Sequence, residues 1–216
     1  MKSKMHEFQK KIKTSSKTNF FLLLAIFFIA ACSCGCTKDA DKGDPIFALP
    51  PETQVGANTF GVTINGKVYL PRDPTGTLTG TSSSGLILWS NPTRTWYEIE
   101  MKDGKSAVGF QMFIHMQPLL TIGSLNLFQS NFRNNIDSPP FTHIYFKIWD
   151  NNISNYAYYG SIENQGILNI TKLSNGIIAG NFKGKFVRND NPNNFITIID
   201  GRFDINSFTL SNTTFP

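Results

Sequence analysis

Apolar and polar residues alternate along a series of short segments from about residue 53 to the C-terminus. These segments are rich in β-branched and aromatic residues, and glycine, asparagine, aspartate and proline separate them. No apolar repeat of 3.6 residues is sustained over the length of a helix, so the pattern predicts one all-β domain over residues 53–216. The domain is expected to have about ten strands, and the segments expected to form them are 60–64, 67–70, 86–89, 96–101, 108–116, 125–128, 144–149, 156–159, 167–173, 177–187 and 195–205.

Turn sequences predict the register of several hairpins. Asn65-Gly66 tolerates positive φ at both positions and therefore predicts a type I′ turn. A three-residue loop at 174–176 would pair Ile170 with Gly180.

A third hairpin is predicted around Asp103-Gly104. A two-residue turn at that position would pair Ile99 with Val108 and Tyr97 with Phe110, so that apolar side chains face one another across the hairpin.

Antiparallel strands joined by short turns close either as two packed sheets or as a barrel. Because the alternation is strict, each sheet should have one buried side and one side that faces solvent. We expect an antiparallel β-sandwich, and a flattened lipocalin-like β-barrel is the alternative.

The first 35 residues follow a different pattern. Six lysines and one acidic residue come before an apolar run from Phe20 to Ala31. This run is too short to span a bilayer as a helix, and small residues and cysteines follow it. The segment is typical of a bacterial lipoprotein signal peptide, ending at residue 35 or at residue 31, and such a signal is absent from the mature protein.

Two cysteines compete as the acylated residue. Ile29 stands three residues before Cys32, as the general lipoprotein pattern requires, whereas Cys36 is followed by Thr-Lys-Asp-Ala-Asp at 37–41. That run resembles the lysine-plus-acid signal that directs Bacteroidota lipoproteins to the outer face of the outer membrane. We favour Cys36, with Cys32 as the alternative. Two or more fatty chains give stable anchoring, and residues 36–52, polar and then proline-bearing, suit a flexible tether.

The charge of the mature chain excludes one class of partner. Residues 1–35 hold six of the 20 Lys and Arg residues and one of the 15 Asp and Glu residues, which leaves 14 of each in residues 36–216. The mature chain is therefore neutral, and we expect no nucleic acid partner because no basic stripe is visible. All three cysteines lie at 32–36, so the domain has no disulfide, no thiol nucleophile and no cysteine metal ligand.

Strand parity places ionisable and aromatic residues on one polar face. The outward positions of three strands hold Trp96, Glu98, Glu100, His115, His143, Tyr145 and Trp149. If these strands are neighbours, the side chains form one patch. Such a patch suits a glycan, because aromatic rings stack on sugar faces while carboxylates and histidine hydrogen-bond hydroxyl groups. The alternative is that they are ordinary cross-strand pairs, or that a loop or a second sheet covers them.

Two further interpretations use the same residues. A metal site at His115, His143 and Glu98 would depend on the adjacency of their strands, and we expect no metal and no cofactor. A glycoside hydrolase needs two carboxylates that flank a cleft, whereas Glu98 and Glu100 lie side by side on one strand. Known catalytic signatures such as His-Glu-x-x-His and Gly-x-Ser-x-Gly are also missing from the sequence.

The beginning and the end of the domain resemble one family. Residues 49–61 (Leu-Pro-Pro-Glu-Thr-Gln-Val-Gly-Ala-Asn-Thr-Phe-Gly), residues 65–71 (Asn-Gly-Lys-Val-Tyr-Leu-Pro) and residues 199–205 (Ile-Asp-Gly-Arg-Phe-Asp-Ile) are similar to a family of uncharacterised Bacteroidota lipoproteins, a domain of unknown function. Members often have a cysteine after the Phe-Gly pair, where this chain has Val62. The resemblance implies an all-β domain and a lipid anchor, and it implies no activity.

These observations predict a lipid-anchored protein of the outer membrane or the cell surface, with the periplasmic leaflet as the alternative to surface exposure. Its β domain is expected to bind or scaffold a partner, such as a surface glycan or an envelope protein, without catalysis. The alternative function is a carbohydrate-active or other hydrolytic subunit that uses Glu98, Glu100 or His115.

Overall fold

The computed structural model describes residues 48–75, 84–105, 108–117 and 121–216. The predicted signal peptide, Cys32, Cys36 and most of the predicted tether 36–52 lie outside the described residues. The described residues belong to one compact unit, Ile46–Pro216, which is the second of two units in the chain. In the part of the chain that is described, no helix is long and apolar enough to cross a membrane.

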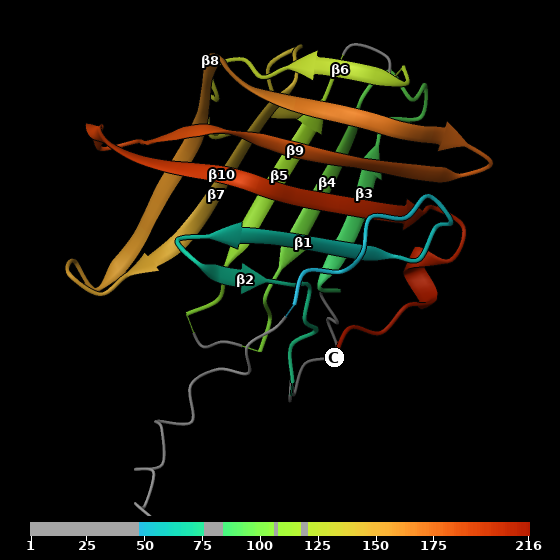
Figure 1. The fold of residues 1–216 in the computed structure, drawn as a ribbon, viewed down its shortest axis with the longest axis horizontal. Coiled ribbons are helices and arrows are strands. Elements are labelled where there is room, and N and C mark those ends of the chain that lie inside the picture. The colour runs from blue at the N-terminus through green and yellow to red at the C-terminus, as the bar shows by residue number, and fades with distance from the viewer. Residues whose placement is uncertain (1–47, 76–83, 106–107, 118–120) are drawn as a thin grey trace, which may run out of the picture. The chain divides into compact units, whose positions relative to one another are not determined.

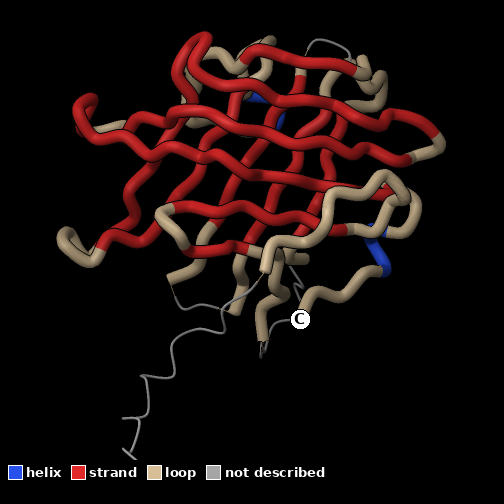
Figure 2. The backbone as a smooth tube through the Cα atoms, in the orientation of Figure 1, coloured by secondary structure: helices blue, strands red, loops and turns tan. Residues whose placement is uncertain are grey.

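Strands dominate this unit, as Figure 2 shows. The described residues form the strands β1 (Thr59–Ile64), β2 (Lys67–Tyr69), β3 (Leu86–Ser90), β4 (Tyr97–Lys102), β5 (Gln111–Met116), β6 (Gly123–Asn126), β7 (His143–Asp150), β8 (Asn155–Ser174), β9 (Ile177–Arg188) and β10 (Asn191–Asn206), with the short 3₁₀ helices η1 (Asn135–Asp137) and η2 (Leu210–Asn212).

All ten strands belong to one antiparallel sheet. Their order is β2-β1-β10-β9-β8-β7-β5-β4-β3, and β6 pairs with β8 beside this path. The sheet curls into a half-barrel, so that β1, β2, β6, β9 and β10 form a front layer that crosses a rear layer of β3, β4, β5 and β7 (Figure 1). The first half of β8 pairs with β7 and its second half with β6, so this strand joins the two layers. The predicted all-β antiparallel class is confirmed.

Irregular pairing accompanies the curl of the sheet. The register between β8 and β9 shifts between Ser161 and Gly166, and the register between β9 and β10 shifts between Ile198 and Gly201. Bulges of this kind bend a strand and let it pass from one layer into the other. The predicted separate strands at 156–159 and 167–173 are therefore one strand, β8, because pairing resumes after the bulge.

Asparagine–glycine pairs form the predicted tight turns. Asn65 and Gly66 both have positive φ and link β1 to β2. The β8–β9 turn has two residues and not the predicted three, because Ser174 pairs with Ile177. A bulge just after Ile170 compensates for the missing residue, and the predicted pairing of Ile170 with Gly180 is confirmed.

The predicted register of the β4–β5 hairpin is wrong. Ile99 pairs with Ile114 and Tyr97 with Met116, because the connection between the strands is longer than two residues. The start of this connection is bound to the segment after β2, because the Asp103 carboxylate accepts hydrogen bonds from the Arg72 guanidinium at 2.6 and 2.5 Å. The shift is an even number of residues, so each side chain of β4 keeps its predicted face.

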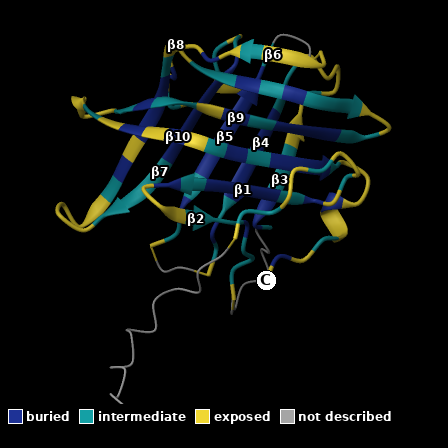
Figure 3. Cartoon of the chain, in the orientation of Figure 1, coloured by how far each residue is buried: buried dark blue, intermediate teal, exposed yellow. Residues whose placement is uncertain are grey.

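The core lies between the two layers (Figure 3). Side chains from the inner faces of both layers are almost completely buried, among them Phe60, Phe146, Phe182, Phe186, Ile99, Met112 and Ile114. Burial of this apolar surface supplies the main stabilisation of the domain, since it has no disulfide.

Candidate functional site

The predicted polar patch is assembled from neighbouring strands on the outer face of the rear layer. Glu98 of β4 lies directly opposite His115 of β5, and His115 lies directly opposite His143 of β7. The His115 and His143 rings are 5.5 Å apart. The three strands on which the predicted patch depended are therefore neighbours in the sheet.

An irregular segment covers this patch. We call residues 127–141, between β6 and β7, the cover segment; it includes η1. Glu98, His115 and His143 are 0%, 1% and 0% exposed, and Tyr145 is also buried. The expectation that these side chains face solvent is therefore wrong, and the alternative of a covering loop is correct.

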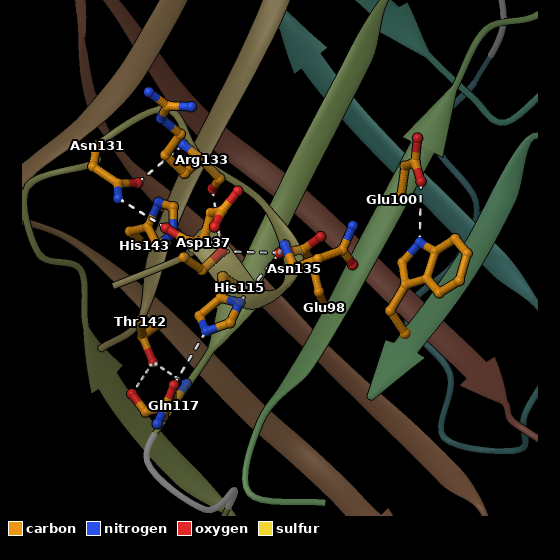
Figure 4. Close-up of polar contacts among 12 residues, drawn as sticks. Glu98, Glu100, His115, Gln117, Asn131, Arg133, Asn135, Asp137, Thr142 and His143 are labelled. Carbon is orange, nitrogen blue, oxygen red and sulfur yellow. Dashed lines mark hydrogen bonds and ion pairs between the residues drawn. The ribbon is translucent and has the colours of Figure 1, made fainter. Parts of the chain in front are cut away.

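Glu98 ties the cover segment to the sheet, as Figure 4 shows. Its Oε2 atom accepts hydrogen bonds from the Asn135 backbone N–H at 2.9 Å and from the Ser138 hydroxyl at 3.2 Å, and it lies 3.2 Å from His115 Nδ1. Its Oε1 atom is buried and has no hydrogen-bond partner among the described residues. One oxygen of a fully buried carboxylate therefore holds both the cover segment and a histidine.

His143 is the second polar anchor beneath the cover segment. Its Nδ1 atom lies 3.0 Å from the Ser130 hydroxyl, and its buried Nε2 atom has no partner in the described part of the chain. Burial, with a smaller contribution from the nearby His115, lowers the pKa of His143 to about 3. His143 is therefore neutral at physiological pH.

The cover segment also packs tightly on aromatic residues. Tyr145 stacks on Phe113 with ring centroids 4.7 Å apart, and the Phe132 ring meets Tyr145 edge-on at 6.1 Å. Burial raises the pKa of Tyr145, and the charges of Glu98 and Glu100 raise it further. A β-carbon at Gly160 would lie 2.8 Å from side-chain atoms of Phe132, so a glycine is needed where the cover segment touches β8.

Glu100 is held by its own set of partners. Its Oε1 accepts a hydrogen bond from Gln111 at 2.6 Å and lies 2.7 Å from Lys102 Nζ, while its Oε2 accepts one from the Trp89 indole at 3.1 Å. Glu98 and Glu100 are thus separately bonded neighbours on one strand. They do not face each other across a cleft, as a glycoside hydrolase would require.

The two predicted tryptophans lie in different places. The Trp96 ring is half-buried 5.4 Å from His115 and borders the buried cluster. Trp149 lies at the opposite end of β7, where its indole donates a hydrogen bond to Asn151 and its ring meets Tyr156 edge-on at 5.4 Å. The structure therefore separates Trp149 from the patch to which the sequence assigned it.

Trp149 belongs instead to a partly exposed group that we call the aromatic corner: Lys147, Trp149, Tyr156 and Tyr158. Cross-strand pairing places Lys147 opposite Tyr158 and Trp149 opposite Tyr156. The Lys147 ammonium lies 4.8 Å from the centre of the Tyr156 ring, and Tyr158 is 41% exposed. This corner presents rings and a cation to solvent on the outer face of the rear layer.

Sequence reasoning missed a further buried carboxylate, on the front layer. Asp204 of β10 is 1% exposed. It accepts hydrogen bonds from the Thr53 hydroxyl at 2.6 Å and from the backbone N–H groups of Val55, Gly56 and Ala57 at 3.0, 2.8 and 3.2 Å. Three successive N–H groups converge on one carboxylate because Gly56 adopts φ +77°.

Asp204 fixes the segment that precedes β1, and we call residues 50–57 the strap. A second attachment holds its start, since the Arg202 guanidinium donates a hydrogen bond to the Pro50 carbonyl at 3.2 Å. Between the two attachments lies a pocket of about 120 Å³. Strap residues 51–54 line one side, and residues of β1, β8, β9 and β10 line the other. The sequence analysis singled out segments 49–61 and 199–205 together, and these segments meet at this point, where Thr59 pairs with Asp204.

No metal arrangement is present in the described residues, where no three His, Cys, Asp or Glu side chains are placed to hold an ion. No family model, no curated protein and no solved structure matches the chain.

Proposed function

We propose that this protein is a lipid-anchored outer-membrane protein that binds or scaffolds a partner at the cell surface without catalysis. The lipoprotein-like N-terminus, with Cys36 as the acylated residue and Cys32 as the alternative, supports the anchor. The neutral, cysteine-free β domain supports a role in binding.

One observation carries the proposal: the strap and the aromatic corner lie on the outer faces of opposite layers. On β1, Phe60 and Val62 point into the core, so Gly61 faces outward. A β-carbon at Gly61 would lie 2.5 Å from Pro50, which places the start of the strap on the outer face of the front layer. Among the described residues, the strap therefore lies on the front layer, and the aromatic corner on the rear layer keeps Tyr158 41% exposed.

The bonding of the carboxylates favours binding over hydrolysis. Three groups approach one oxygen of Glu98, and partners engage both oxygens of Glu100. A general acid or nucleophile must instead reach its substrate within hydrogen-bond distance. These two residues hold the outer face together, which makes the hydrolytic alternative the less supported function.

The aromatic corner suits a glycan or a polar protein surface as its partner. Exposed tyrosine and tryptophan rings stack on the C–H faces of sugars or pack against side chains, and their polar tips donate hydrogen bonds. Lys147 adds a cation beside these rings. The partner is therefore expected to carry hydroxyl or carboxylate groups beside an apolar face.

The anchor is tested on the native protein. Metabolic labelling with a fatty-acid probe should mark the protein, and mass measurement of its N-terminal peptide should place the acyl chains on Cys36 or Cys32. An unmodified mature N-terminus that begins elsewhere would contradict the anchor. Protease shaving of intact cells should release peptides of the domain, and shaving that releases none would contradict surface exposure.

The binding face is tested by cross-linking on cells that express the full chain. Tyr158→Ala should reduce the yield of cross-linked partner several-fold, because it removes the most exposed ring of the aromatic corner. Phe208→Ala is the matched control, since Phe208 is 69% exposed but lies outside this corner. Equal yields for the two variants would rule out the aromatic corner as the binding face.

A further inference from the structure

The pocket under the strap is a built feature and not an accident of a loose terminus. Asp204 receives four hydrogen bonds from strap residues 53–57, and Arg202 holds Pro50. The strap is therefore pinned on both sides of residues 51–54, which arch over β1, β10 and β9. A wall fixed in this way keeps the pocket open without a ligand, and such preorganisation lowers the cost of binding.

The charged groups at this pocket are one guanidinium, Arg202, and two carboxylates, Asp200 and Glu52. The Arg202 guanidinium donates two hydrogen bonds to the Asp200 carboxylate and a third to Pro50. The hydrogen bonds that Arg202 donates to Asp200 raise the pKa of Arg202, with a smaller contribution from the nearby Glu52 carboxylate. An anionic ligand would have to displace Asp200 from this guanidinium and would also meet the Glu52 carboxylate, so the pocket disfavours an anion.

The remaining lining groups both donate and accept hydrogen bonds. Asn181 accepts a hydrogen bond from the Asn169 amide with its carbonyl oxygen, so its own NH₂ group is directed to other partners. The Gln54 amide and the hydroxyl groups of Thr59 and Thr171 also line the pocket, with no side-chain hydrogen bond to the described residues. Such a mixture matches ligand hydroxyl groups, because each hydroxyl also both donates and accepts.

The size of the pocket and the apolar part of its lining further restrict which ligands fit. The volume of about 120 Å³ is close to that of an engineered cavity of about 150 Å³ that holds a benzene ring. Pro51 adds apolar surface to the lining. The pocket therefore has room for one six-membered ring with a C–H face, while the hydroxyl groups at the edge of the ring reach the polar lining and the solvent side, where Glu52 and Gln54 are exposed.

We infer that this pocket binds the ring of a single neutral sugar, a hexopyranose. The sugar hydroxyls would bond to Gln54, Thr171 and Asn181, and the ring face would lie against Pro51. The site is on the front layer, apart from the aromatic corner, and does not depend on the lipid anchor. Its failure would therefore leave the proposed function standing, and the reverse also holds.

The test is an NMR titration of the ¹⁵N-labelled mature domain, residues 36–216. The probes are D-glucose, D-galactose, D-mannose and N-acetyl-D-glucosamine, each raised to tens of millimolar, with sodium acetate and sodium phosphate as anionic comparisons. At least one sugar should shift the amide signals of Thr53, Gln54, Asn181 and Arg202. No shift with any sugar, or shifts at these residues with the anions alone, would overturn the inference.

Matched variants decide whether the shifts report the pocket. Gln54→Ala removes an exposed amide, and Thr171→Val removes a hydroxyl with little change of shape, so both should fold and should weaken sugar binding at least fivefold. Asn193→Ala is the control, because Asn193 is an exposed asparagine of β10 outside the pocket. Sugar affinity that is unchanged in both pocket variants would overturn the inference.

Discussion

The cover segment and the strap are two irregular pieces of chain that pack on the outer faces of the same sheet, and each is held by one buried carboxylate. Glu98 uses a single oxygen to hold the cover segment, whereas Asp204 uses both of its oxygens to hold the strap. Beneath the cover segment, histidines and stacked aromatic rings fill the space. Beneath the strap, a pocket remains.

The difference lies in what the sheet presents under each segment. Across β4, β5 and β7, the cross-strand row holds large rings that the cover segment contacts directly. Across β9 and β10, the pairs on the outer face are Asn181 with Arg202 and Ala179 with Asp204, so no aromatic ring rises from the sheet toward the strap. An irregular segment held by a buried carboxylate therefore covers a filled space on the rear layer and a pocket on the front layer.

Asp204→Ala should give the largest effect, since it releases four donors at once. We expect the free energy of unfolding to fall by about 3–4 kcal/mol, because hydrogen bonds to a buried charged acceptor are among the strongest in proteins. Urea unfolding measures this change. Asp204→Asn keeps one acceptor oxygen and should lose less, and a loss below about 1 kcal/mol for Asp204→Ala would show that the strap is held mainly by other contacts.

Glu98→Ala should lower the free energy of unfolding by a smaller amount, about 2–3 kcal/mol. The substitution frees the Asn135 N–H and the Ser138 hydroxyl, but it also removes a buried oxygen that has no partner among the described residues. Hydrogen exchange at Asn135 should accelerate more than exchange in the strap. Equal acceleration in both segments would mean that the two regions are not held independently.

His143 should make the rear layer sensitive to acid. Its pKa of about 3 in the folded chain is below the ordinary value of 6.5, so the unfolded chain takes up a proton first as the pH falls through 6.5. The stability contributed by neutral His143 is therefore complete above pH 6.5 and is lost progressively toward pH 3. Between pH 6.5 and pH 5 the loss is about 2 kcal/mol.

This pH dependence is measured by urea unfolding at several pH values in the parent and in His143→Gln. Other titrating groups affect both proteins, so the difference between the two curves isolates His143. The variant should lose less stability than the parent between pH 6.5 and pH 5. Parallel curves would mean that His143 does not titrate differently in the folded and unfolded chains.

Local patterns predicted the strands and their faces, and they failed where distant segments meet. Alternation assigned Ile99 and Ile114 correctly to the core even though the β4–β5 register was wrong, because a shift by an even number of residues keeps every side chain on its face. Asn65-Gly66 fixed its turn because the conformation depends on those two residues alone.

The candidate site was predictable only in part. Strand parity brought Glu98, His115 and His143 together, since parity and adjacency are properties of the sheet. Their burial depends on the Asn135 backbone N–H, which carries no sequence signal. The Asp204 contacts likewise go mostly to backbone groups about 150 positions away, so spacing along the chain could not indicate them.

Trp149→Ala should give the smallest effect and lower the free energy of unfolding by about 1 kcal/mol. This variant tests whether the aromatic corner is less tightly packed than the patch beneath the cover segment. Trp149 is only half-buried, and its contacts are an edge-on ring at Tyr156 and a hydrogen bond to Asn151 within its own turn. The same substitution at a fully buried tryptophan would lower the free energy of unfolding by about 3–5 kcal/mol. Thermal and urea unfolding separate the two cases. A large loss would place Trp149 in a packed environment that the neighbouring strands alone do not supply, and partner binding at the aromatic corner would then have to rest on Tyr158 and Lys147.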